Sequence, residues 1–172
     1  TLGAVFWSDG FRIAPGLPDL PQITRCAPGA PMFWVASARV LGHLQAGLHG
    51  EDPTWVAAPV VRALAGEEFL EALAAGLGDT PQRERYLRLR AWWSANAGFR
   101  QVGTPAATPG MSDFPSGSPA RANLEALAPL LDEDQLPDRL LKAELMRQLA
   151  RFDEAQALLP TEPPQDAGAR AR

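Results

Sequence analysis

The chain has 172 residues and a mass of 18.5 kDa, with 46% hydrophobic and 21% charged residues. This balance excludes a wholly disordered chain and a disulfide-bonded scaffold, and the length fits one domain or one domain with an appendage. Twenty acidic against sixteen basic residues give a net charge of −4. We therefore expect no binding to nucleic acid, because such binding needs a basic surface.

Neither a membrane nor a disulfide-forming compartment is indicated by the sequence. It contains no run of about 18 apolar residues, the length that a transmembrane helix requires. The single cysteine, Cys26, excludes an internal disulfide and is compatible with a reducing compartment. We therefore expect a cytoplasmic protein.

The N-terminal third predicts a β-hairpin followed by an irregular segment. Asp9-Gly10 lies between aromatic and β-branched residues over 4–13, a pattern typical of a hairpin. Residues 14–31 are rich in proline and glycine, which favours an extended wrap rather than a helix.

Helical spacing of apolar residues then predicts a mainly α-helical chain with about six short helices. Thr80-Pro81, a cap followed by a first-turn proline, opens the strongest of them. The helical patterns cover 32–48, 53–65 with an initial turn, 69–77, 81–97, 121–131, 138–149 and 152–159.

Proline- and glycine-rich residues 101–120 have the composition of a linker, since few of their side chains can repay the entropy of ordering. The chain is thus predicted to comprise an N-terminal unit over 1–100, this linker, a helical hairpin over 121–160 and a mobile tail over 161–172.

The helix over 81–97 carries the candidate binding residues. Tyr86, Leu89 and Trp93 form a stripe predicted to face the core. Neighbouring residues lie about 100° apart on a helix, so Trp92 is expected at the surface. Arg85, Arg88 and Trp92 lie together on that outer side, and an aromatic ring beside guanidinium groups is typical of a protein contact site. This is the predicted partner site.

Charge is distributed unevenly around that helix. Residues 51–79 carry six acidic residues and one basic residue, whereas 81–100 carry five arginines and one glutamate. The simplest interpretation is two helices that attract each other within one domain. The alternative is a basic face that binds an acidic partner.

Residues 138–159 resemble one tetratricopeptide-type helix pair. Ala143 and Ala155 occupy the positions where that family places small residues, and Phe152-Asp153-Glu154-Ala155 matches its turn, with Ala150 where the family has glycine. The resemblance implies a helical hairpin in an interaction scaffold. No second copy of the repeat occurs, so an ordinary hairpin that closes the domain remains the alternative.

The segment from Thr24 to Ala30, followed by Phe33-Trp34, has a weaker resemblance to a zinc knuckle, with Gly29 in place of the second cysteine. A tetrahedral zinc site needs four ligands, and His43 and His49 are too far apart around a helix to share a face. We therefore expect no metal, and Cys26 is expected to be a buried structural residue.

No nucleophile elbow, phosphate loop or dinucleotide fingerprint occurs, so we assign no catalytic residue and no cofactor. The sequence favours a non-enzymatic, bacterial-type interaction or scaffold module whose partner is another protein. One alternative is an enzyme or binding protein for an anionic small molecule, with a cleft lined by Trp34, Trp92 and Arg88. A second is an antitoxin- or immunity-like subunit, which the acidic balance would suit. The sequence leaves the oligomeric state open.

Overall fold

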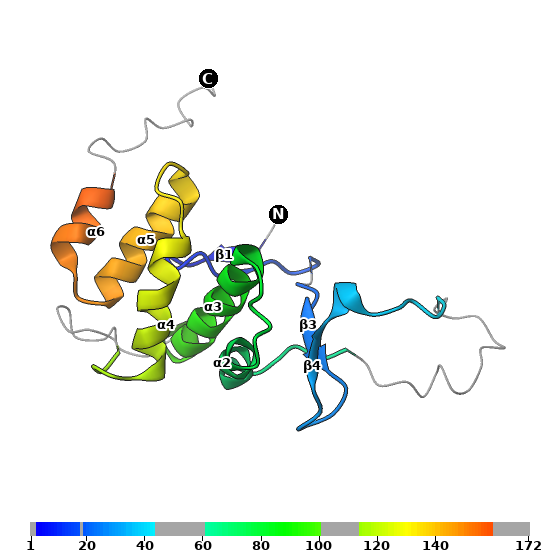
Figure 1. Cartoon of the computed structure of the whole chain (residues 1–172). Coiled ribbons are helices and arrows are strands. Elements are labelled where there is room, and N and C mark those ends of the chain that lie inside the picture. Colours follow the sequence, from blue (N-terminus) through cyan, green and yellow to red (C-terminus); the bar gives the residue numbers. More distant parts are fainter. Residues whose placement is uncertain (1–2, 18, 44–60, 101–113, 160–172) are drawn as a thin grey trace, which may run out of the picture.

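The computed structural model describes residues 3–17, 19–43, 61–100 and 114–159. Within these ranges the chain is mainly α-helical, as predicted, but it has five α-helices rather than about six, preceded by two short antiparallel hairpins (Figure 1). The α-helices are α2 (Gly66–Ala74), α3 (Pro81–Ala95), α4 (Pro119–Leu127), α5 (Leu136–Gln148) and α6 (Phe152–Leu158).

The predicted N-terminal hairpin is present. Strands β1 (Val5–Phe6) and β2 (Arg12–Ile13) pair antiparallel, with Val5 opposite Ile13. Asp9 stabilises the turn, because its Oδ1 accepts a hydrogen bond from the Phe11 N–H at 3.0 Å. Gly10 follows with φ +77°, a conformation that glycine adopts without steric cost.

A second hairpin, β3 (Ile23–Arg25) and β4 (Met32–Trp34), lies where the sequence indicated an irregular wrap and the start of a helix. The prediction of a helix over 32–48 is wrong for residues 32–43, the part that the structure describes. In this part β4 is followed by a 3₁₀ turn, η1 (Val35–Ser37), and then by non-helical chain. Bulky apolar residues also favour a strand, and β4 buries Trp34 against the first helices. Residues 44–48 lie outside the described part.

The helix predicted over 53–65 is likewise absent where it can be checked. Residues 61–65 are not helical, and 53–60 lie outside the described residues. The predictions of a helix after Gly66 and of a Thr80-capped helix are confirmed by α2 and α3. Thr80 Oγ1 accepts a hydrogen bond from the Arg83 N–H at 3.2 Å.

Helix α3 is the centre of the molecule, with α2 on one side and α4 on the other (Figure 1). Its residues Leu87 and Ala91 enter a first core, whereas Leu89 and Trp92 enter a second. The first core also contains Ile23, Trp34, Leu64, Phe69 and Ala72; the second also contains Phe114, Leu124, Leu127, Leu145, Met146 and Leu149. One helix therefore joins the N-terminal elements to the C-terminal helices.

After α3 the chain forms a 3₁₀ turn, η2 (Asn96–Arg100), and most of the predicted linker, 101–113, lies outside the described residues. Residues 114–118 have no helix or strand, as predicted, and α4 begins at Pro119, capped by Ser118. It continues into a 3₁₀ turn, η3 (Ala128–Leu130). Helices α5 and α6 then pack as the predicted hairpin. The division into separate units and the tail over 161–172 stay predictions.

Candidate functional site

The prediction that Trp92 lies at the surface is wrong. Its side chain is only 1% exposed and sits in the second core. Its indole Nε1 donates a 2.7 Å hydrogen bond to Oε1 of Gln148, a buried residue of α5. This polar contact explains how the most polar part of the ring can be buried at little cost. Trp92 is therefore not available to a partner.

The two arginines of the predicted site are also engaged within the chain. Arg85 Nη2 lies 2.5 Å from Oδ1 of Asp138, at the beginning of α5. Arg88 pairs with Glu84 one turn earlier, at 2.7 Å. Asn123 Nδ2 of α4 donates a hydrogen bond to the backbone carbonyl of Arg88 at 3.0 Å, and Arg88 Nη1 donates one to Asn123 Oδ1 at 3.4 Å. Both side chains hold the helices together rather than forming a free basic patch.

The error comes from assuming one buried stripe on α3. A helix covered on several sides carries apolar residues all round, and its spacing then no longer identifies a single core face. Leu87 faces α2, whereas Leu89 and Trp92 face the C-terminal helices. Trp93 faces the N-terminal hairpin, because its Nε1 donates a 2.8 Å hydrogen bond to the Asp9 carbonyl. Only the tertiary structure reveals these three contacts.

Other arginines of α3 and η2 contact aromatic rings. The guanidinium carbon of Arg83 lies 5.0 Å from the ring centre of Trp34, and that of Arg100 lies 4.1 Å from the ring centre of Phe11. Arg90 stands over three rings, those of Phe69, Tyr86 and Trp93, at 5.6–5.9 Å. These distances allow cation–π attraction, so the arginines help to attach the N-terminal segments to α3.

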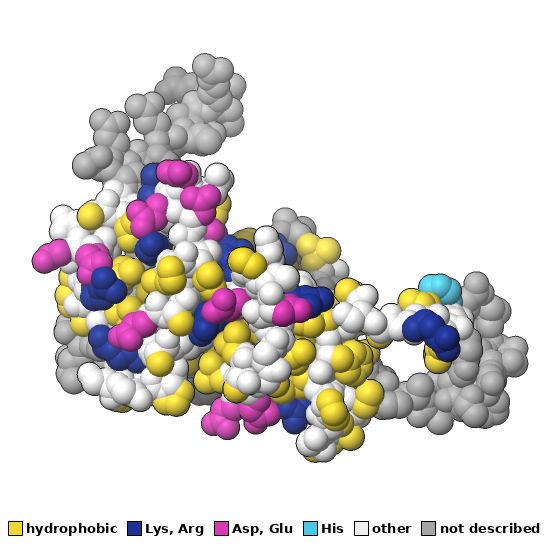
Figure 2. Space-filling view, viewed as in Figure 1, with side chains coloured by type: hydrophobic (Ala, Val, Ile, Leu, Met, Phe, Trp, Pro, Cys, Tyr) yellow, Lys and Arg dark blue, Asp and Glu magenta, His cyan; other side chains and the backbone are white. Residues whose placement is uncertain are grey.

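The predicted attraction between the 51–79 and 81–100 segments is present in only one ion pair of the described residues, Asp79 with Arg83 at 2.8 Å. Glu68 instead pairs with Arg62 and Arg25, while Arg90 pairs with Asp19. On the face seen in Figure 2, acidic and basic side chains are interspersed over the helices. The helices α2 and α3 do pack together, but mainly through their apolar residues.

The cleft expected from Trp34, Trp92 and Arg88 is not assembled. Trp34 lies in the first core and Trp92 in the second, on different sides of α3. The indole of Trp34 donates a 3.0 Å hydrogen bond to the carbonyl of Leu77. The three side chains therefore do not line one site for an anion.

A buried polar network attaches the N-terminal hairpin to α3 and η2. Asp9 is only 3% exposed, and its Oδ2 accepts hydrogen bonds from Asn96 Nδ2, at 2.8 Å, and from Arg100 Nη2. Arg100 Nη1 also donates to the carbonyl of Trp93 at 2.5 Å. The pattern around Asp9 predicts only a turn, because its distant partners are 87 and 91 residues away along the chain.

The same turn contacts α5. A Cβ atom at Gly10 would lie 2.6 Å from Cδ2 of Leu141, a distance that real Cβ atoms do not show. Glycine is favoured here by its positive φ, and a larger residue would also have to displace the Leu141 side chain. The turn of the hairpin is consequently fixed at both α3 and α5.

The strands of this hairpin carry exposed apolar side chains, in contrast to the buried Asp9 of its turn. Val5 and Ile13 form a cross-strand pair and are each about half exposed, while Phe6 is 68% exposed. Val5 and Ile13 lie on one face of the hairpin and Phe6 lies on the other, and we call these three exposed residues together the N-terminal apolar surface. Arg12, opposite Phe6, is exposed and has no ion-pair partner among the residues that the structure describes. Such apolar exposure on a fixed element is typical of a contact surface.

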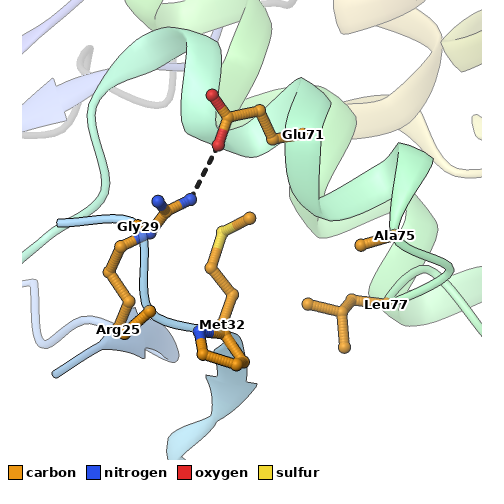
Figure 3. Close-up of a pocket in the computed structure, with 8 residues that line it drawn as sticks. Arg25, Gly29, Met32, Glu71, Ala75 and Leu77 are labelled. Atoms are coloured by element: carbon orange, nitrogen blue, oxygen red, sulfur yellow. Dashed lines mark hydrogen bonds and ion pairs between the residues drawn. The ribbon is translucent and has the colours of Figure 1, made fainter. Parts of the chain in front are cut away.

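A recess of about 680 Å³ lies between the β3–β4 turn and the end of α2 (Figure 3). Met32 and Leu77 supply its apolar lining, and Arg25 reaches across to Glu71. Arg25 Nη2 lies 2.7 Å from Glu71 Oε2, and its Nε lies 3.2 Å from Glu68 Oε1. Two carboxylates thus neutralise the one guanidinium, which argues against an anion site here.

A larger apolar groove, of about 690 Å³, crosses α3 between the N-terminal ends of α2 and α4. We call it the α2–α4 groove. Trp92 and Phe114 line it on one side, and Leu64 and Leu70 line it on the other. No sequence pattern indicates this groove, because its lining residues come from three separate segments.

The described residues contain no group of three or more His, Cys, Asp or Glu side chains able to hold a metal ion. Cys26, in the turn between β3 and β4, is exposed, so the expectation of a buried structural cysteine is wrong. No described helix is long and apolar enough to cross a membrane.

The tetratricopeptide-like segment forms α5 and α6, with Ala143 and Ala155 both buried. Ala150, at the position where that family has glycine, adopts φ +61°. The Arg151 N–H bonds to the Met146 carbonyl at 2.9 Å, and the Ala150 N–H bonds to the Arg147 carbonyl at 3.0 Å. This is a Schellman termination of α5, which favours glycine at that position.

Comparisons of the chain with models of known protein families, with curated proteins and with solved structures found no match.

Proposed function

We propose that the chain is a protein–protein interaction module and that its partner contacts the N-terminal apolar surface. The single observation that carries this proposal is the contrast within one hairpin. Its turn is held by the buried side chain of Asp9, whereas Val5, Phe6 and Ile13 on its strands are exposed. A surface fixed in advance loses little conformational entropy when a partner binds.

The chemistry of the surface indicates an extended partner segment. In a two-stranded sheet each strand has an edge that no strand of the same sheet pairs, and a further strand can add to such an edge. Val5 and Ile13 would contact apolar side chains of that segment, and Arg12 on the opposite face would pair with a carboxylate. The expected partner therefore presents a strand in which apolar and acidic residues alternate.

The test begins with a photo-crosslinking residue in place of Phe6, used to identify the partner in extracts of the source organism. The purified partner is then titrated calorimetrically against Val5→Ser/Phe6→Ser. Because these side chains are exposed, the variant should fold normally and weaken binding at least about tenfold, or about 1.4 kcal/mol. Arg12→Glu should also weaken binding, most strongly at low salt.

The matched control is Leu136→Ser/Leu140→Ser, which removes two exposed leucines of α5 and leaves the strands of the hairpin unchanged. It should leave the affinity unchanged. The proposal fails if no protein is crosslinked through position 6, or if the hairpin variant binds as tightly as the unmodified chain.

A further inference from the structure

The α2–α4 groove lies where the two cores meet on α3. Leu64 and Ala91 in its lining belong to the first core, whereas Trp92 and Phe114 belong to the second. The adjacent residues Ala91 and Trp92 point into different cores. The groove is thus the space between two separately packed groups of side chains.

Small side chains keep this space open. Ala91, Ser94 and Ala95 form the α3 side of the groove, and Ala120 lies on α4. Gly66 of α2 approaches α3 so closely that an added Cβ would lie 2.7 Å from Cβ of Ser94. The helix backbones are therefore held in place beside the groove, and no large side chain among the residues that the structure describes fills it.

The lining defines the chemistry of a ligand. Apolar side chains predominate, and the polar contacts available are those of Ser94, Ser118 and Asn123. Glu67 is the one charged residue in the lining among the residues that the structure describes, and it is exposed. We propose that the α2–α4 groove binds an uncharged, largely apolar small molecule whose aromatic ring packs against the apolar side chains of the lining.

Size and charge together support this occupant. Small-molecule sites usually have volumes of about 300–1,000 Å³ and apolar linings with few polar groups, and a groove of about 690 Å³ falls within that range. A carboxylate or phosphate would find no lysine or arginine in the described lining and would be repelled by Glu67. This inference does not depend on the N-terminal apolar surface.

The test uses two fluorescent probes on the full chain. N-phenyl-1-naphthylamine is neutral and aromatic, whereas 1-anilinonaphthalene-8-sulfonate has a similar body with a negative charge. The neutral probe should bind saturably at one site and raise the melting temperature, because a ligand bound only by the folded state stabilises it. The anionic probe should bind more weakly, and Glu67→Gln should reduce that difference.

Two variants are designed to fill the groove, Ala95→Leu at its exposed rim and Ala120→Phe deeper inside. Each should weaken binding of the neutral probe at least about tenfold. Ala157→Leu is the matched control, because Ala157 is also an exposed helical alanine, on α6. If Ala120→Phe does not fold, the affinity of Ala95→Leu for the neutral probe tests the proposal by itself.

Three results would overturn the proposal. These are absence of saturable binding by the neutral probe, equal binding to the filled and control variants, and tighter binding of the anionic probe to the unmodified chain.

Discussion

Trp92 and Trp93 are neighbours on α3, yet their environments differ. Trp92 is fully buried in the second core and is hydrogen-bonded to Gln148. Trp93 is partly buried and reaches the N-terminal hairpin through its hydrogen bond to the Asp9 carbonyl. Each indole thus has a polar partner from a distant part of the chain, which satisfies its N–H group away from water.

Replacement of Trp92 by alanine should lower the free energy of unfolding by about 3–5 kcal/mol, because it leaves a large cavity and removes the partner of Gln148. Trp92→Phe should cost clearly less, since it retains an aromatic ring in the core. Urea denaturation followed by circular dichroism measures both. A Trp92→Ala variant as stable as the unmodified chain would show that Trp92 is not a core residue.

Glu68 is the residue whose charge responds most clearly to its surroundings. Hydrogen bonds from the Arg62 side chain and the Ala65 N–H, together with the charge of Arg25, lower its pKa from the ordinary 4.5 to about 2. The folded state therefore favours the ionised carboxylate. The stabilisation is complete above the unfolded pKa, near 4.5, and is lost as the pH falls towards 2.

We expect Glu68→Gln to lower the free energy of unfolding by about 1 kcal/mol at pH 6, a modest value because the side chain of its partner Arg62 is 41% exposed. This difference should shrink as the pH falls from about 4.5 to 2, because the carboxyl of the unmodified chain is then neutralised. Urea denaturation of both proteins at a series of pH values measures it. A difference that stays constant over this range would contradict the assignment.

At the scale of single elements, α2 and α5 end in the same way with different residues. In α2 the positive-φ position is Gly76, and in α5 it is Ala150. Both ends have the paired hydrogen bonds of a Schellman motif. The conformation costs an alanine about 1–2 kcal/mol, whereas glycine adopts it freely.

The two caps therefore predict opposite effects of reciprocal substitutions. Ala150→Gly should stabilise the chain by about 0.5 kcal/mol, after allowance for the greater entropy of glycine in the unfolded state, and Gly76→Ala should destabilise it by about 1 kcal/mol. Midpoints of urea denaturation, measured side by side, report the signs. If Ala150→Gly were the more harmful of the two, the assigned end of α5 would be wrong.

At the scale of the whole molecule, α3 joins two cores and the N-terminal hairpin into one structure. The hairpin is attached by the buried contacts of Asp9 with Asn96 and Arg100, and by the close approach of Gly10 to Leu141. A two-stranded hairpin is marginally stable by itself. Its order therefore depends on these contacts with helices that are distant in the sequence.

Asp9→Asn should destabilise the chain by about 3 kcal/mol, because it leaves the Arg100 guanidinium largely buried without its counter-charge. It should also weaken binding at the N-terminal apolar surface. The control is Asp19→Asn, which removes an exposed partner of Arg90 and should cost less than about 1 kcal/mol. Thermal and urea unfolding compare them, and equal stabilities of the two variants would contradict the role of Asp9.

Much of the local structure was predictable from the sequence. Asp9-Gly10 identified the first hairpin, Thr80-Pro81 identified the start of α3, and helical spacing identified α5 and α6. These signals arise from interactions between residues within about four positions of each other, such as turns and caps, and these interactions act in any tertiary setting. The second hairpin was missed, because Ile23 and Trp34 pair across a proline-rich loop whose composition favours irregular structure.

Which faces are buried was decided only by the tertiary structure. The residues of α3 alone predict a capped helix rich in arginine and aromatic residues, but they do not show that three groups of elements surround it. The spacing of apolar residues identifies a core face only when a helix is buried on a single side. Trp92, predicted at the surface, is therefore buried, and the charges of Arg85 and Arg88 are neutralised by ion pairs within the chain. The partners of Asp9 and the α2–α4 groove likewise depend on segments far apart in the chain, because burial is a property of packing rather than of local conformation.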